Sequence, residues 1–290
     1  MQISKRSFAV CTGRGAHLMS KILKRYVPFM QAGVQSLIIY RMNFIGFVIG
    51  GLIYCFVMFY LWKAVFESSG GGEFFGFSMA DMVVYLFLSN TTTQLTYSSV
   101  STTIGEEIRD GSISMRLLKP VNTDLSYMFS ELGEVMIKVA VLLLPIIIGL
   151  EIYRFRTTGV IMFNAVNFIL YLLSVVLAYI ISVRVNLCFG FIAFYVKNLW
   201  GINILKNSLI GFLSGSLIPL AFMPSTLRVC LEYMPFASMA YTPVMIYMGK
   251  YEVNEMLFRL GLQAVWAVLL YGFSKLIWLG AIKKLSVQGG

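Results

Sequence analysis

Four polar side chains in an otherwise apolar segment have the spacing of one helical face. Within residues 82–104, intervals of four, three and four residues separate Asn90, Gln94, Tyr97 and Ser101. Residues three or four apart share one side of an α-helix, and buried amides are costly in lipid unless they find partners or water. The pattern favours a face that lines a translocation path or a subunit seam. The alternative is that Ser and Thr bond their own i−4 carbonyls while small residues pack helices closely.

A single arginine interrupts the apolar region 160–195. Arg184 lies between two apolar runs, and an arginine inside a membrane span is by default a functional residue. If the span ended near Val183, Arg184 would be interfacial, but residues 185–196 would be too few to cross. If the helix continues to Tyr195, Arg184 is buried and needs a carboxylate or a polar face, with segment 82–104 the nearest candidate. There it would hold an anionic group of the substrate or form a structural ion pair.

The connection after segment 82–104, within residues 105–130, mixes charges of both signs with apolar side chains. Its candidate contact residues are Glu106, Glu107, Ile108, Arg109, Asp110, Met115, Arg116 and Leu117. A short helix that docks into a groove of a soluble partner combines apolar anchors with a charged rim. The alternative is a simple reversal that lies on the bilayer.

Long apolar segments must position these residues. Of the 290 residues 58% are hydrophobic and 12% charged, with a mean hydropathy of +0.80, whereas soluble domains carry about 25% charged residues. Several uncharged runs exceed the roughly 20 residues that cross a bilayer as a helix. We therefore predict an all-α polytopic membrane protein with six spans near 42–64, 82–104, 132–151, 160–195, 200–220 and 259–282. Residues 1–41 form an arm and residues 42–290 the transmembrane domain.

The positive charge is unevenly distributed. The net charge is +10, and residues 1–41 hold seven Lys or Arg and no acid. By the positive-inside bias, both termini are expected in the cytoplasm. Anionic lipid headgroups are a sufficient partner for this charge, so nucleic acid is not expected. The pair Arg154 and Arg156, on the predicted outer side, runs against the bias.

Two segments outside the spans have a predicted shape. Apolar residues recur at steps of three or four between Leu18 and Leu37, which is typical of a helix in the cytoplasmic interface. Pro28 is expected to split this segment into two short helices that meet at an elbow. Between spans five and six, residues 220–250 are apolar yet rich in proline. We predict outer helices there that enter the membrane and return.

Several chemistries are excluded by residue type. The single His17 has no acid or cysteine cluster nearby, and the four cysteines do not make a disulfide scaffold. The one Gly-Lys pair, Gly249-Lys250, is followed by Tyr251, so no P-loop is present. A membrane enzyme would need paired acids or a Ser/His set. An ion-coupled carrier or channel, the alternative function, would need acids within the membrane, and only Glu131 and Glu134 come close.

Three segments then resemble one family. Arg-Asp-Gly-Ser-Ile-Ser-x-x-Leu-Leu-Lys-Pro at 109–120, Leu-Ser-Gly-Ser-Leu-Ile-Pro-Leu-x-x-x-Pro at 213–224 and Leu-Glu-Tyr-Met-Pro-Phe at 231–236 are similar to segments of type-2 ABC transporter permeases of bacteria. The order of elements matches over nearly the whole chain.

The resemblance implies a function. It implies a bacterial plasma-membrane permease, an exporter, that pairs with a second copy or a related permease. It also implies two cytoplasmic ATPase subunits, which would hold ATP and Mg and act through a coupling helix after span two. The chain itself is then expected to have no catalytic residues, no cofactor and no metal.

Overall fold

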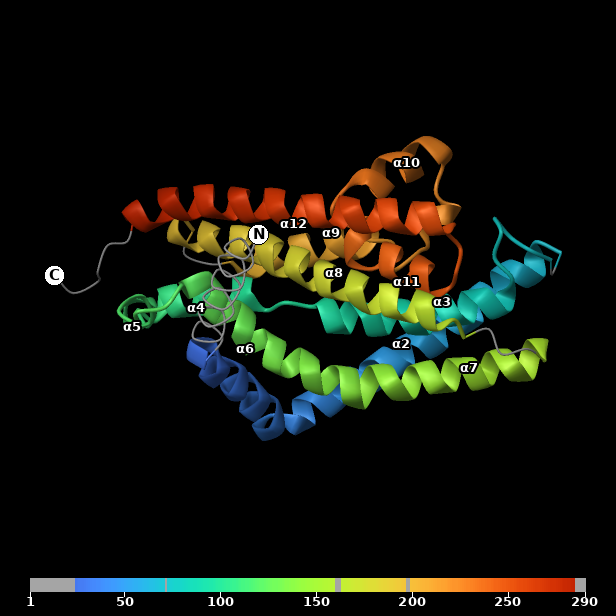
Figure 1. The fold of residues 1–290 in the computed structure, drawn as a ribbon, viewed down its shortest axis with the longest axis horizontal. Coiled ribbons are helices and arrows are strands. Elements are labelled where there is room, and N and C mark those ends of the chain that lie inside the picture. Colours follow the sequence, from blue (N-terminus) through green and yellow to red (C-terminus); the bar gives the residue numbers. More distant parts are fainter. Residues whose placement is uncertain (1–23, 71, 160–162, 197–198, 285–290) are drawn as a thin grey trace, which may run out of the picture.

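The described chain is a bundle of helices that lie roughly along one axis (Figure 1). The structure is a computed structural model, and it describes residues 24–70, 72–159, 163–196 and 199–284. Within these residues the only strand-like pairing is an isolated bridge between Phe74 and Phe77. The predicted all-helical class is confirmed for the described part of the chain.

Four helices are long and apolar enough to cross a membrane. They are α2 (Arg41–Ser68), the continuous helix Thr123–Thr157, the segment Ala165–Phe194, which contains α8 (Ala165–Phe191), and α12 (Val253–Ala281). They correspond to four of the six predicted spans. The other two predicted spans contain α3 (Met79–Thr96), of 18 residues, and α9 (Trp200–Leu213), of 14 residues. At 1.5 Å per residue α9 is only about 21 Å long, which is less than the hydrocarbon thickness.

The helix at the third predicted span is longer than predicted. The helix predicted at 132–151 begins at Thr123, because the Asn122 side chain accepts hydrogen bonds from the N–H groups of Asp124 and Leu125. It runs as α6 (Thr123–Lys138), a π-helical turn (Val139–Leu143) and α7 (Leu144–Thr158). The π turn directly precedes Pro145, which has no N–H to continue the helical ladder.

The long region 160–195 is occupied by one helix without a break. α8 begins after Asn164, whose side chain accepts from the N–H groups of Val166 and Asn167. It ends at Phe191, and a 3₁₀ turn covers Ile192–Phe194. α8 packs against α12, α11 (Tyr241–Tyr247), α4 (Val100–Arg109) and α3. It is therefore the central helix of the bundle.

The predicted break at Pro28 is wrong for the described residues. Residues 24–39 form one helix that includes Pro28, and the chain turns at Tyr40 before α2 begins. The hydrogen bond that Pro28 cannot donate would reach the carbonyl of Lys24, at the edge of the described helix, so the turns beyond it are unaffected. The part of the predicted arm before residue 24 lies outside the described residues.

Helix 24–39 packs backbone to backbone against α6. A Cβ on Gly33 would lie 1.8 Å from the Ser130 carbonyl oxygen, and one on Gly133 would lie 2.1 Å from the Met30 carbonyl oxygen. Next to this crossing, the Asn122 N–H donates to the Tyr26 hydroxyl at 3.0 Å. Only glycine permits such an approach, so two glycines locate helix 24–39 on α6.

Short helices fill the segment between α9 and α12. They are Leu220–Phe222 (3₁₀), α10 (Ser225–Tyr233), Ala237–Met239 (3₁₀) and α11. All seven residues of α11 are buried, whereas α10 projects from the bundle in Figure 1. Helices are thus present within residues 220–250, where outer helices were predicted. Their depth in a membrane stays a prediction.

Ion pairs join α10 to α12. Glu232 binds Arg228 at 2.8 Å and Arg259 at 2.5 Å, and Arg259 also binds Glu255 at 3.1 Å. The last helix starts earlier than the predicted span, since α12 begins at Val253 and the span was predicted from 259. Arg259 is buried within this helix, where its charge has acidic partners. The Arg154 charge is likewise paired, with Glu151 at 3.5 Å.

Candidate functional site

A break in the helix separates the four predicted polar residues. α3 begins at a capping box between Ser78 and Asp81 and ends at Thr96. Tyr97 is extended, with φ −60° and ψ 133°, and α4 begins at Val100. Ser101 therefore lies on a different helix from Asn90 and Gln94. The prediction that all four share one helical face is wrong.

A carboxylate from α6 stabilises the break. Glu131 Oε1 accepts hydrogen bonds from the Ser99 N–H at 2.6 Å and the Ser99 hydroxyl at 3.1 Å. Its other oxygen, Oε2, is buried without a hydrogen-bond partner. A broken helix at membrane depth is tolerated only where protein or water satisfies the freed backbone groups. Glu131 supplies that partner here.

Asn90 and Gln94 satisfy one another in part. Gln94 Nε2 donates to Asn90 Oδ1 at 2.7 Å, and both amides lie over Gly51 of α2, where a Cβ would come within 2.9 Å of each. Hydroxyls nearby bond to their own helix, since Thr91 donates to the Phe87 carbonyl and Thr96 to the Thr92 carbonyl. For these two threonines, the alternative that hydroxyls bond carbonyls of their own helix is therefore confirmed. The side-chain amides of Asn90 and Gln94 lie at the contact between α2 and α3.

Two cavities flank the break. The larger, of about 420 Å³, lies between helix 24–39, the start of α2, the end of α3 and α6. The smaller, of about 190 Å³, lies between α3, α8, α9 and the segment around Met239. Thr93 and Tyr97 line both, and Gln94 lines the larger one. Of the predicted path residues, Gln94 and Tyr97 thus line a cavity.

Ser101 belongs to a separate, buried polar cluster. Its hydroxyl donates to Asn203 Oδ1 at 2.6 Å, and Lys206 Nζ donates to the same oxygen at 3.2 Å and to Asn186 Oδ1 at 2.5 Å. Close packing of α4 on α8 allows this contact, since a Cβ on Gly190 would lie 2.8 Å from Ile104 Cδ1. Ser101 and Lys206 are nearly inaccessible to solvent. This cluster holds α9 to α4 and α8.

Arg184 is buried, and its partner is not on α3. α8 continues past it to Phe191, and Arg184 Nη1 donates to Asp124 Oδ2 at 3.2 Å. Lys275 of α12 binds the same oxygen at 2.8 Å. The expectation that the polar face of 82–104 would bind Arg184 is wrong, because Asp124 in the first turn of α6 is closer and carries a full charge.

The predicted docking loop folds as two short helices and a turn. α4 runs to Arg109, and α5 (Ile113–Leu117) follows after Gly111 in a left-handed conformation with φ 80°. Arg116 Nε donates to Glu107 at 2.9 Å, and the Tyr127 hydroxyl also donates to Glu107. The Arg116 guanidinium lies 4.0 Å over the Tyr127 ring. Glu107, Arg116 and Tyr127 thereby brace α4, α5 and α6 against one another.

The predicted docking residues divide into a brace and an exposed surface. Glu107, Ile108, Arg116 and Leu117 are half-buried. The exposed members are Glu106, Arg109, Asp110 and Met115, and Leu118 joins them with 79% of its surface exposed. Hydrogen bonds from Ser112 lower the pKa of the Asp110 carboxyl, which keeps it charged. This surface, Glu106, Arg109, Asp110, Met115 and Leu118, is the tip of the bundle.

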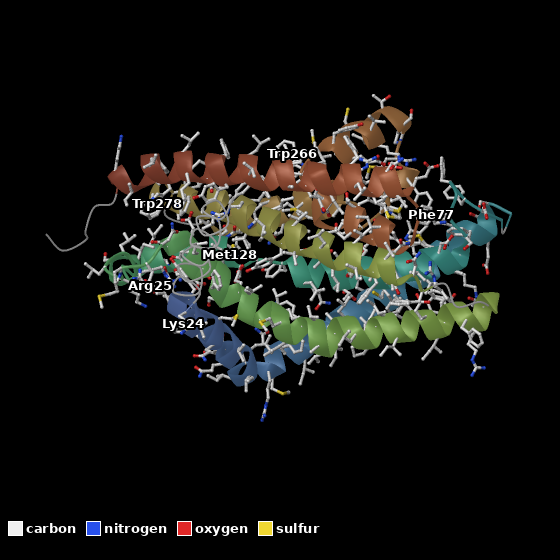
Figure 2. All side chains as sticks on the ribbon, in the orientation of Figure 1. Lys24, Arg25, Phe77, Met128, Trp266 and Trp278 are labelled. Carbon is white, nitrogen blue, oxygen red and sulfur yellow. The ribbon has the colours of Figure 1, made fainter. Side chains whose placement is uncertain are left out.

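Basic residues share that end of the molecule. Lys24 and Arg25, in helix 24–39, lie near α5, whereas Phe77 lies at the opposite end (Figure 2). The tip and the first described basic residues, Lys24 and Arg25, therefore lie at the same end of the bundle. This agrees with the uneven charge of the sequence.

Three residues of these clusters, Asp124, Lys206 and Lys275, were not singled out from the sequence. Glu131 was noted there only as an acid close to the membrane, and its contact with Ser99 was not expected. The signal was present for Asp124, since Asn122-Thr-Asp124 is an N-terminal capping pattern, and for Glu131 as an acid beside an apolar run. In the described residues, no group of three His, Cys, Asp or Glu is placed to hold a metal ion.

Comparison with known proteins gives one match. The model of the family described as "ABC-2 family transporter protein" matches residues 52–289. The matched residues begin within α2, at Leu52, and include the break at Tyr97, the tip and the short helices before α12. No curated protein matches the chain.

Proposed function

The chain belongs to the ABC-2 transporter family, and from that membership we propose that it is the permease subunit of an exporter driven by separate ATPases. The family assignment confirms the resemblance of residues 109–120, 213–224 and 231–236. The chain is a multi-pass membrane protein with long apolar helices. ATP and Mg would bind in the partner subunits, and this chain would supply the path.

The braced tip is the observation that carries the proposal. Met115 and Leu118 are 68% and 79% exposed, and the charged Glu106, Arg109 and Asp110 lie around them. Exposed apolar anchors with a charged rim suit a groove on a soluble protein. The Glu107 to Arg116 ion pair gives the tip a fixed shape. The tip is the part of this chain that we assign to contact with the ATPase.

The fold offers a route from the tip into the bundle. α6 begins five residues after α5 ends, and its first turn carries Asp124, which binds Arg184 of α8 and Lys275 of α12. The same helix carries Gly133, on which helix 24–39 packs. A movement of the tip would therefore reach α8, α12 and helix 24–39 through α6.

We place the tip and both termini in the cytoplasm of a bacterial cell. The basic residues at the tip end support this orientation. The six crossings would be completed by α3 with α4 and by α9 with the short helices that follow it. The apolar surface of α9, with Trp200 72% and Leu205 62% exposed, is a suitable seam for a second permease. Two ATPases per dimer would complete the complex.

The larger cavity supports export rather than import. It lies toward the tip, between helix 24–39, α3 and α6. In the proposed orientation, cargo would enter it from the cytoplasm or the inner leaflet. The transport path would pass Gln94 and Tyr97, with Asn90 positioning Gln94. Ser101 and Arg184 would hold helices together.

The test is purification of the tagged chain from its native membrane. We expect an ATPase to co-purify and ATP to drive efflux from cells. Charge reversal at Glu106, Arg109 and Asp110 should abolish co-purification, as should Met115→Glu with Leu118→Glu. The control is charge reversal at Glu67 and Glu73, near the opposite turn between α2 and α3. Unchanged co-purification of the tip variants would contradict the coupling assignment, and transport that persists without an ATPase would favour an ion-coupled carrier or channel.

A further inference from the structure

The larger cavity is lined by a carboxylate, Glu131, that forms no ion pair among the described residues. Of the cavity's three charged residues, Glu134 binds Lys138 at 3.5 Å, and Glu131 pairs with neither of them. Glu131 Oε1 is held by Ser99, and Oε2 is buried with no hydrogen-bond partner. A buried anionic oxygen without a partner is costly. A cation in the cavity would remove that cost.

Two basic residues close to Glu131 have hydrogen-bond or ion-pair partners of their own. Lys206 lies behind the α3–α4 break and donates to Asn186 at 2.5 Å and Asn203 at 3.2 Å. Lys138 belongs to Glu134 on its own helix. When its two glutamates and one lysine are ionised, the cavity wall carries a net charge of −1, and Glu131 is the member without an ion pair.

The rest of the cavity wall is aromatic and apolar. Tyr40, Phe44, Phe47 and Tyr97 line it, and Gln94 adds an amide. Aromatic faces attract cations within about 6 Å of the ring centre, because the face of the ring is electronegative. The volume of about 420 Å³ lies within the range of small-molecule sites, roughly 300 to 1,000 Å³. Aromatic walls suit an organic ion better than a metal ion, which prefers several oxygen ligands.

We propose that this cavity binds amphipathic organic cations, with the Glu131 carboxylate as counter-ion and the aromatic side chains around the apolar part of the ligand. The inference rests on the proposed function and deepens it, since it names a substrate class for the exporter. Glu131 has two roles in it. Its Oε1 holds the helix break at Ser99, and the negative charge of the carboxylate attracts the cation in the cavity that Glu131 lines.

The experiment measures binding of two ions of the same shape and opposite charge. The full-length chain is placed in phosphatidylcholine nanodiscs, and tetraphenylphosphonium and tetraphenylborate are titrated by equilibrium dialysis. We expect saturable binding of the phosphonium above the uptake by empty nanodiscs, and no such excess for the borate. Glu131→Gln should weaken phosphonium binding by at least about tenfold, while the Gln carbonyl still accepts from Ser99. Phe44→Leu should weaken it by about two- to fivefold through loss of an aromatic face.

Glu67→Gln is the matched control, because it removes a carboxylate that is outside the cavity and exposed. It should bind like the unmodified chain. Thermal unfolding of each variant shows whether the fold is retained. Equal binding of the two ions, or unchanged binding after Glu131→Gln in a folded protein, would overturn the proposal.

The binding measurement needs no ATPase, so its outcome can be separated from that of the co-purification experiment. Phosphonium binding that fails while an ATPase co-purifies overturns the substrate class and leaves the permease assignment standing. Binding that depends on Glu131 without any ATPase supports the cavity and counts against the permease assignment.

Discussion

Asp124 and Arg184 form a buried ion pair that joins the first turn of α6 to the last third of α8. The Asp124 carboxylate and the Arg184 guanidinium are 3.2 Å apart, and their side chains are only 3% and 5% exposed. Lys275 adds a second contact to Asp124 at 2.8 Å. Because α6 begins just after the tip, this pair is the shortest charged connection from the tip to the central helix.

Asp124→Asn should destabilise the protein by about 3 kcal/mol. It leaves the buried Arg184 without a counter-ion, and breaking a buried pair costs roughly 3 to 5 kcal/mol. Thermal unfolding in detergent measures the loss. Lys275→Met should cost less, since Lys275 is 30% exposed. The double change Asp124→Asn with Arg184→Met should recover part of the loss, and a double variant no better than Asp124→Asn would contradict the pairing.

Glu107→Gln should loosen the tip without unfolding the bundle. It removes the charge that binds Arg116 and accepts from the Tyr127 hydroxyl. Hydrogen exchange of residues 106–120 should become faster, and trypsin should cleave there sooner. Glu106→Gln is the control, because the Glu106 side chain is exposed and forms no hydrogen bond or ion pair with this brace in the described part of the chain. Equal exchange in both variants would show that the ion pair does not brace the tip.

Gly133→Ala should separate helix 24–39 from α6. The added Cβ would lie 2.1 Å from the Met30 carbonyl oxygen, and backbone cannot yield cheaply. Overpacking of this kind costs about 1 to 3 kcal/mol. Gly149→Ala, on α7 of the same continuous helix, meets nothing within 4 Å and should instead stabilise the helix by about 0.5 to 1 kcal/mol. Melting temperatures that shift in opposite directions are the expected result, and a parallel shift would contradict the crossing.

Glu232→Gln should release α10 from α12. Glu232 binds both Arg228 and Arg259, and Arg259 is buried. We expect a loss of about 2 kcal/mol, because a charge-assisted hydrogen bond to a buried arginine is worth roughly 1.5 to 3 kcal/mol. Glu255→Gln should cost less, since its side chain is 42% exposed. Unfolding midpoints in detergent separate the two, and equal midpoints would contradict the ranking.

The local features of the fold follow from the sequence. Uncharged runs predict long helices such as α2, α8 and α12, since apolar length is a property of contiguous residues. Prolines within residues 220–250 predict short helices for the same local reason. The mixed charges at 105–130 and the family resemblance identify the tip. Sequence alone thus determined the class of protein, the positions of most helices and the segment that forms the tip.

Only the tertiary structure decided which polar side chains bind one another. Ser101 pairs with Asn203, 102 residues away, and Arg184 with Asp124, 60 residues away. The break at Tyr97 has no proline or glycine to announce it, and it exists because Glu131 of another helix accepts from Ser99. Which polar groups meet depends on how helices pack, and packing is set by contacts between residues remote in sequence. The period of a polar face therefore predicted a continuous path where the fold builds two cavities and an ion pair.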